Sequence, residues 1–296
     1  NGACPITNHH VRDVLDSLGG VRVLFPIFAQ FSLPDENGSY EPEPELGVEV
    51  IELIGAMLRH NVTNQHFVQV ADGFSLLAHL LERVSPEYMT SDTITAIVNL
   101  CTRVRFSELY LTKVLKHVLT NFRLWLFTPL GTQLHVFNVI LHEAQTNVER
   151  FRSSDVLGVP RLLAALRLYY WIEPPTVLDG GDQWVRAMQL EHPVTKEITG
   201  RRLIGDELVE ARLSMFRILN HIFLPARPTT FRMTTPQRRN SSKGDSEPTT
   251  TRRRQSAAQD VREVHALLGA VASTTCLQER YEFLSFALNL MKSSTN

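Results

Sequence analysis

Apolar residues recur along this chain at the three- and four-residue spacing that places them on one face of an α-helix. One such stripe runs through segment 46–60, and its members are Val50, Ile51, Ile54, Met57 and Leu58. Four later stripes have the same spacing: Ile94, Ile97, Val98 and Cys101; Leu111, Val114, Leu115, Val118 and Leu119; Leu130, Leu134, Phe137 and Leu141; and Tyr281, Leu284, Leu288 and Met291. Strand-like alternation is scarce, and its best example, Val21–Phe25, also fits a helix. The pattern predicts an all-α chain of about a dozen helices of roughly 10–18 residues.

Three segments interrupt the helical pattern. Pro34–Glu45 contains five acidic residues and three prolines, and we expect an exposed loop there. Glu173–Arg202 is rich in Pro and Gly and is predicted to be a long irregular connection. Pro225–Ser256 contains eleven Ser/Thr and eight Lys/Arg but one aromatic residue, Phe231. Because this last segment cannot bury enough apolar surface to offset the entropy of ordering it, we expect it to be disordered.

A short pattern with glycine before an apolar helix occurs three times, and internal repeats of this kind separate a solenoid from a helical bundle. The three instances are Leu18–Phe25, Ala71–Leu77 and Leu157–Leu163. A glycine can end one helix in the left-handed conformation and let the next helix turn sharply against it. The successive glycines are 53 and 85 residues apart, and the second interval is about twice the length of an armadillo or HEAT repeat. The sequence therefore predicts an armadillo/HEAT-like α-solenoid.

The predicted organisation has three parts. Residues 1–224 form an armadillo-like helical region, residues 225–256 form a disordered basic linker, and residues 257–296 form a final helical pair that continues the solenoid. No run of about 20 uninterrupted apolar residues is present, so we expect no transmembrane helix. The first residues also lack the basic and apolar pattern of a signal peptide.

The overall charge conceals an uneven distribution. The chain has 30 Lys+Arg and 31 Asp+Glu, a formal net charge of −1, which argues against a nucleic-acid-binding protein. Residues 225–256 carry eight basic and two acidic residues, so the rest of the chain has 22 basic and 29 acidic residues, a net charge of −7. The 3 cysteines exclude a disulfide scaffold and indicate a reducing compartment. This distribution allows a local electrostatic contact of the linker, either with an anionic partner or with the acidic helical region itself.

Patterns that carry catalysis or cofactor binding are missing from the sequence. It has no GxGxxG, GxxxxGK[ST] or GxSxG motif, and its cysteines form no CxxC pair. Solvated helix ends and core packing account better for the weaker candidates. These are the pair His9–His10 for a metal, Glu207 and Glu210 for catalysis, and Trp125, Trp171 and Trp184 for a ligand pocket. We therefore predict no catalytic, cofactor-binding or metal site.

Two serines in the linker fit the substrate pattern of a basophilic kinase. Arg238-Arg239-Asn240-Ser241 and Arg253-Arg254-Gln255-Ser256 each place two arginines two and three residues before the serine. Phosphorylation would add about −1.5 to −2 charges per serine. Ser241 and Ser256 are therefore the candidate phosphorylation sites, and a basic linker without regulation is the alternative. The same basic residues also suit contact with an anionic membrane surface.

Five segments resemble, in the same order, the neurobeachin branch of BEACH-domain proteins. They are Leu18–Pro26, Gly73–Glu82, Trp125–Pro129, Leu163–Pro174 and Tyr281–Met291. The motifs are short and mostly apolar, but together they span most of the chain, and their shared order argues against chance. Residues 225–256 differ from the family and look like a lineage-specific insertion.

The resemblance implies a segment of a large cytoplasmic scaffold of membrane traffic, whose full-length form associates peripherally with membranes. In that family the region is armadillo-like, precedes PH-like, BEACH and WD-repeat domains, and offers no functional residue to transfer. We expect a non-enzymatic segment whose stacked helices present a groove to a protein partner. Leu130–Gln145 and Leu157–Tyr170 are the candidate inner helices. An armadillo adaptor outside membrane traffic, importin-like or formin-regulatory, and an enzyme with an all-α core are the alternatives.

Overall fold

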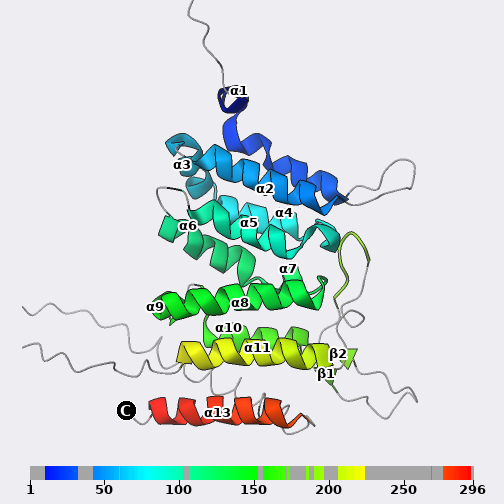
Figure 1. Cartoon of the computed structure of the whole chain (residues 1–296), viewed down its shortest axis with the longest axis vertical. Coiled ribbons are helices and arrows are strands. Elements are labelled where there is room, and N and C mark those ends of the chain that lie inside the picture. Colours follow the sequence, from blue (N-terminus) through cyan, green and yellow to red (C-terminus); the bar gives the residue numbers. More distant parts are fainter. Residues whose placement is uncertain are drawn as a thin grey trace, which may run out of the picture.

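The computed structural model is a stack of helices, with α1 at one end and α13 at the other (Figure 1). It describes residues 11–32, 43–59, 61–102, 104, 107–152, 156–170, 172–173, 185–186, 190–196, 206–223, 268 and 276–294. The elements are α1 (Val11–Ser17), η1 (Gly20–Val23), η2 (Phe25–Ser32), α2 (Pro44–Leu58), α3 (Val62–Val70), α4 (Gly73–Leu81), η3 (Pro86–Tyr88), α5 (Ser91–Thr102), α6 (Ser107–Val114), η4 (Leu115–Leu119), α7 (Phe122–Trp125), α8 (Leu130–Thr146), α9 (Val148–Arg152), α10 (Val159–Ala165), η5 (Leu166–Tyr170), β1 (Ile172–Glu173), β2 (Val185–Arg186), α11 (Asp206–Phe223) and α13 (Leu277–Ser294).

Five helices form one row of the stack. α2 packs on α5, α5 on α8, α8 on α11 and α11 on α13, and each lies across the molecule alongside the one before it (Figure 1). The first three begin at residues 44, 91 and 130, so their starts are 47 and 39 residues apart. These intervals are close to the length of an armadillo or HEAT repeat. The predicted all-α solenoid is therefore confirmed.

A second row packs alongside the first and contains shorter pieces. α4 packs against η4, which continues α6 directly, while η5 continues α10 and packs against α11. η4 is a π-helical turn, and at its end the backbone N–H of Thr120 donates to the carbonyl of Leu115, five residues earlier, at 2.9 Å. Such turns are rare, widen the helix locally and often occur at functional sites.

The core between the rows contains aromatic rings that join successive repeats. Phe74 of α4 meets Tyr110 of α6 edge to face at 5.2 Å, and Phe137 of α8 meets Tyr170 of η5 in the same way at 5.8 Å. Some polar groups that enter the core are paired there, although Gln65 Oε1 and Asn220 Oδ1 are buried without a hydrogen bond to any described residue. The hydroxyl of the fully buried Tyr170 donates to Gln133 Oε1 at 3.0 Å. Each repeat is therefore fixed to the next by specific contacts as well as by apolar burial.

The three glycine motifs differ in conformation, which corrects the expectation that each glycine ends a helix in the left-handed form. Gly20 does have a φ of +68°, and a Cβ there would overlap Asn64 Oδ1. In the second motif Asp72 takes the left-handed conformation, with φ 49°, and Gly73 begins α4. In the third motif Gly158 is extended, with φ −78° and ψ 159°. The backbone conformation at the turn therefore differs among the three motifs.

One of the predicted apolar stripes marks the wrong helix face. In α13 the predicted residues Tyr281, Leu284 and Leu288 are 72%, 54% and 50% exposed, whereas Phe283 and Phe286 are fully buried. Phe283 packs on Phe216 of α11, so the buried face of α13 is the opposite one. The predicted stripe of α8 does face the core: Phe137 is buried, and Leu130, Leu134 and Leu141 are partly buried against it. The other buried residues of this helix lie beside the stripe, at Thr132, Gln133, Val136, Ile140 and Ala144.

Several predicted boundaries also change. α2 begins at Pro44, inside the predicted loop Pro34–Glu45, because proline suits the first turn of a helix. Val21–Phe25 lies in 3₁₀-helical turns rather than a strand. The described α-helices have 4 to 18 residues, so several are shorter than predicted. Within the predicted irregular connection, β1 and β2 form one short antiparallel pair. Residues 225–256, and all of 257–275 except Leu268, lie outside the described residues.

Candidate protein-binding groove

Two adjoining hollows lie along the second row of helices. The first, of about 360 Å³, lies between α4 and η4 and is lined by Ser75, Ala78, His79, Glu82, Lys116, His117, Asn121 and Arg161. The second, of about 210 Å³, lies between α4 and α7 and is lined by His79, Glu82, Arg83, Arg123, Leu124, Phe127, Glu191, His192 and Pro193. They share His79 and Glu82, so they adjoin, and the two hollows together are here called the basic groove.

The basic groove has more positive than negative charge, unlike the acidic helical region around it. Its cations are Arg83, Lys116, Arg123 and Arg161, and its acids are Glu82 and Glu191, which leaves a formal excess of two positive charges with the histidines neutral. Arg83, Arg123 and Arg161 are exposed, and Lys116 is half-buried. Cations inside a depression are partly shielded from water, so they attract an anionic partner more strongly than cations on an open surface.

Contacts within the groove fix several of its polar groups. Asn121 Nδ2 donates to Glu82 Oε1 at 2.9 Å, which joins the start of α7 to the end of α4. Arg161 donates to the carbonyls of Val156, Thr120 and Lys116 at 3.3, 3.4 and 3.5 Å. These are long hydrogen bonds, and a guanidinium has five N–H donors, so Arg161 keeps donors for a further acceptor. It is therefore positioned by the backbone while remaining able to bind an anion.

The cations of the first hollow affect the pKa of His117. Burial lowers its pKa from the ordinary value of 6.5, and the cations Lys116, Lys113 and Arg161 lower it further, against the opposing effect of Asp72. Asp72 forms an ion pair with Lys113 at 3.2 Å, which partly neutralises both charges. His117 is therefore uncharged at neutral pH. An anion bound beside it would raise its pKa and promote its protonation.

One wall of the second hollow is formed by residues 190–196. His192 is 5% exposed, and its ring lies edge to face against Phe127 at 4.9 Å. Its Nδ1 accepts the backbone N–H groups of Val194 and Thr195 at 3.3 and 3.2 Å. These contacts hold the segment against Phe127, just after the end of α7. Glu191 and Pro193, on either side of His192, line the groove with it.

A larger hollow of about 390 Å³ lies in the first row, between α2 and α5. Its charged residues are Glu52 and Arg59, so it carries no excess of either sign. It is confined to two helices, whereas the basic groove receives residues from α4, η4, α7, α10 and the 190–196 segment. The basic groove is therefore the better candidate for a binding site that depends on the stacked architecture.

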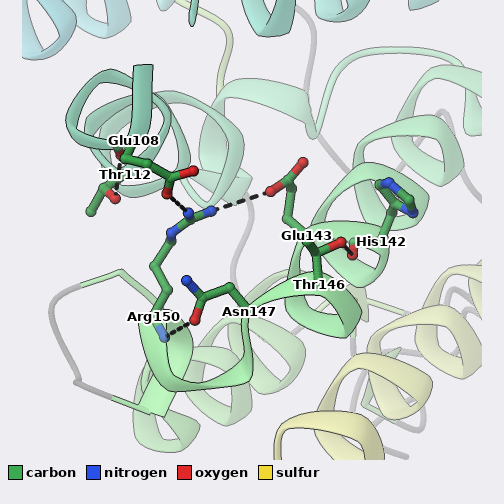
Figure 2. Close-up of polar contacts among 7 residues, drawn as sticks. All are labelled: Glu108, Thr112, His142, Glu143, Thr146, Asn147 and Arg150. Carbon is green, nitrogen blue, oxygen red and sulfur yellow. Dashed lines mark hydrogen bonds and ion pairs between the residues drawn. The ribbon is translucent and has the colours of Figure 1, made fainter. Parts of the chain in front are cut away.

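A separate polar cluster clamps the repeats together near α9. Figure 2 shows the side chain of Arg150 between Glu108 of α6 and Glu143 of α8. Arg150 forms ion pairs with both acids, at 3.2 Å to Glu143, and only 8% of its side chain is exposed. Asn147 Oδ1 accepts the backbone N–H of Arg150 at 3.3 Å and so caps the start of α9. All its charges are paired, which favours a structural role.

Replacing Arg150 with methionine should destabilise the solenoid, because the mostly buried carboxylate of Glu143 would lose its partner. We expect the free energy of unfolding to fall by about 1–3 kcal/mol, measured by urea denaturation. The matched control is Arg167→Met at an exposed position of η5, which should change stability by less than about 0.5 kcal/mol. Equal effects of the two substitutions would show that the clamp contributes nothing beyond an ordinary surface arginine.

The weaker candidates from the sequence are not brought together by the fold. Trp125 is fully buried in the core, and Glu207 and Glu210 are exposed in the first turn and a half of α11. Burial, with a smaller contribution from Glu143, raises the pKa of Cys101 to about 12, so its thiol stays protonated and is a poor nucleophile. The others, His9–His10, Cys4, Trp171, Trp184, Ser241 and Ser256, lie outside the described residues.

The described part of the chain offers neither a metal site nor a membrane-spanning helix. No group of three or more His, Cys, Asp or Glu side chains there could hold a metal ion. No helix in that part is both long enough and apolar enough to cross a bilayer.

The sequence did not reveal the basic groove. Its cations stand at positions 83, 116, 123 and 161, and no two of them are close enough to form a recognisable motif. One hint of the groove was present in the sequence. Lys116, His117, Asn121 and Arg123 are polar residues in a stretch that otherwise has the pattern of an apolar helix. Only the stacking of α4, η4, α7 and α10 places these side chains around the two hollows.

The two-row stack of helices defines an α-solenoid. The sequence profile of the family described as "Neurobeachin/BDCP, DUF4704 alpha solenoid region" matches residues 1–295. This chain therefore belongs to that family of neurobeachin-type α-solenoid regions, as its sequence resemblance indicated.

Curated relatives agree with this assignment. The chain is 25% identical to a neurobeachin homologue of Caenorhabditis elegans over 59% of its length, and 22% identical to one of Caenorhabditis briggsae over 97%. It is 23% identical to BEACH domain-containing protein B of Arabidopsis thaliana over 54%. It spans only 7%, 10% and 6% of these proteins, respectively. No solved structure matches the chain.

Proposed function

We propose that this chain is a non-enzymatic, protein-binding segment of a BEACH-family scaffold in membrane traffic. The observation that carries the proposal is the basic groove, which runs across several stacked elements and combines exposed cations with an apolar wall of Leu124 and Phe127. Adjoining hollows of this kind suit an extended peptide or a helix of a partner better than a small substrate. The resemblance of the chain to neurobeachin homologues supports a scaffold role.

The proposal includes where the segment acts in the cell. The segment acts in the cytoplasm, and association with membranes belongs to the full-length protein rather than to the described helices. A basophilic kinase acting on Ser241 and Ser256 would reduce the positive charge of residues 225–256 and so change any contact that this segment makes with an anionic partner.

Affinity purification with the whole 296-residue chain tests the binding function. The groove variant is Lys116→Glu/Arg123→Glu, and the matched control is Arg167→Glu/Arg217→Glu, which makes the same change in net charge at positions that line neither hollow. We expect the wild type and the control to capture the same vesicle-associated proteins from a cytoplasmic extract, and the groove variant to lose them. Capture that is identical for all three chains would contradict a role for the groove.

A further inference from the structure

We propose that the basic groove recognises an extended acidic peptide whose carboxylates are separated by uncharged residues. This inference rests on the proposed protein-binding function and names the chemistry of the partner. It follows from how the charges are distributed along the groove, from the donors that remain available and from the response of His117 to an anion.

The cations of the groove are spread along its length and do not converge on one point. Lys116 and Arg161 belong to the first hollow, whereas Arg83 and Arg123 belong to the second. A single phosphate group would need several donors directed at one place. A series of carboxylates along an extended peptide instead meets each cation in turn, because alternate side chains of an extended chain point to the same side.

The acids of the groove select against a continuous polyanion. Glu82 lies where the two hollows meet, held there by Asn121, and Glu191 lines the second hollow. A densely charged ligand, such as a nucleic acid or a polyphosphate, would place negative charge beside these carboxylates. Unfavourable like-charge contacts of this kind discriminate between partners as effectively as attractive ones. A peptide with spaced acids can present uncharged residues at Glu82 and Glu191.

His117 makes this binding dependent on pH. The groups that face it are Lys113, Lys116, Arg161 and Asp72, and His79 and Glu82 line the same hollow. The free groove holds His117 neutral, because its pKa lies below 6.5. A carboxylate bound nearby raises that pKa, so binding takes up a proton, and affinity increases as the pH falls from the raised pKa of the bound state towards the pKa of the free state, which lies below 6.5. The peptide carboxylates stay ionised in this range, since their pKa values are about 4.

Fluorescence anisotropy with a defined probe tests the inference. The probe is a labelled peptide of about twelve residues with Asp at every second position and Ser elsewhere, and the control peptide has Asn in place of Asp. We expect the whole wild-type chain to bind the Asp peptide and not the Asn peptide. Binding should weaken at least about tenfold in Lys116→Glu/Arg123→Glu and stay within about twofold of wild type in Arg167→Glu/Arg217→Glu. Circular dichroism of every variant checks that a loss of binding is not a loss of folding.

The pH profile separates a built site from general attraction. Between pH 7.5 and 5.5 the wild type should bind the Asp peptide more tightly, by up to about tenfold for each unit by which the pKa of His117 rises. The variant His117→Asn should lose most of this increase, whatever its affinity at pH 7.5, because asparagine takes up no proton. A His117→Asn profile identical to that of the wild type would remove His117 from the inference.

Competing ligands decide the identity of the partner. Binding to phosphatidylserine vesicles or to inorganic phosphate in preference to the Asp peptide would overturn the inference, as would equal loss in both charge-reversed variants. No binding of the Asp peptide by the wild type would also overturn it. The proposed function is tested separately, by the capture of cellular partners. If the groove variant still captures them, the proposed function is contradicted. If the groove variant loses them but the wild type does not bind the Asp peptide, the protein-binding function stands and only the inference about acidic peptides is overturned.

Discussion

Replacing Glu279 with alanine is expected to lower the free energy of unfolding by about 3–5 kcal/mol and to release α13 from the stack. Glu279 is fully buried, and its Oε1 lies 2.5 Å from Nε of Arg212, whose side chain is only 10% exposed. Arg212 also donates from Nη1 to the carbonyl of Tyr170 at 3.2 Å. The ion pair therefore joins α11, α13 and the end of η5. Without Glu279, the guanidinium keeps its charge in the core and loses its counter-ion.

Two comparisons isolate the ion pair from a general loss of contacts. Glu282→Ala, one turn along the same helix, removes a hydrogen bond from Asn220 at 3.1 Å at a half-buried position and should cost no more than about 1.5 kcal/mol. The double substitution Arg212→Met/Glu279→Met should recover much of the loss, because an apolar pair of similar volume avoids the buried charge. Urea denaturation gives the energies, and hydrogen exchange of the amides of α13 shows the release. An effect of Glu279→Ala no larger than that of Glu282→Ala would contradict this account.

Glu279 also shows why the buried face of α13 was predicted wrongly. This helix carries apolar residues on two opposite faces, Tyr281, Leu284 and Leu288 on one and Phe283 and Phe286 on the other. Helical periodicity identifies both faces but cannot choose between them. The face that is buried carries a glutamate, which can be buried because Arg212, 67 residues earlier, pairs with it. Such a long-range pair cannot be inferred from a single sequence.

The helical class of the fold was predictable for a simpler reason. The stripe Val50, Ile51, Ile54, Met57 and Leu58 is buried as a whole, because α2 has only one strongly apolar face. The turns were less predictable, since left-handed backbone can be supplied by Asp72 as well as by Gly20. The basic groove could not be predicted at all. The charge distribution of the sequence drew attention to residues 225–256, whereas the cations of the groove are scattered singly along the helices.

Trp125 was one of three tryptophans considered for a ligand pocket, and its position assigns it to the core. It is fully buried, and its Nε1 donates to the carbonyl of Val118 at 3.2 Å. It ends α7, the short helix that carries Arg123 and precedes Phe127. Because α7 has only four residues, its own backbone hydrogen bonds are too few to hold it, and it is held by its buried side chains Phe122, Leu124 and Trp125, of which the indole is the largest.

Trp125→Ala should therefore lower the free energy of unfolding by about 3–5 kcal/mol, the range for removing a large aromatic side chain from a core. The carbonyl of Val118 would also lose one of its donors but would keep the backbone N–H of Asn121 at 3.2 Å, so this hydrogen bond adds little to the loss. Trp125→Phe, which keeps most of the ring volume, should cost about 1–2 kcal/mol. Thermal and urea denaturation measure these changes.

The same substitution should disturb the basic groove in the protein that remains folded. Displacement of α7 moves Arg123 and Phe127, so the Asp-containing peptide should bind the folded Trp125→Ala protein several-fold more weakly than it binds Trp125→Phe. The control is Glu279→Ala, which also destabilises the fold but lies in α13, a helix that contributes no residue to either hollow. The two variants are compared at equal folded fraction. Equal peptide affinity in these two variants would show that α7 keeps its place without the indole. Weaker binding in Trp125→Ala alone would establish that this core tryptophan supports the groove by holding α7 in position.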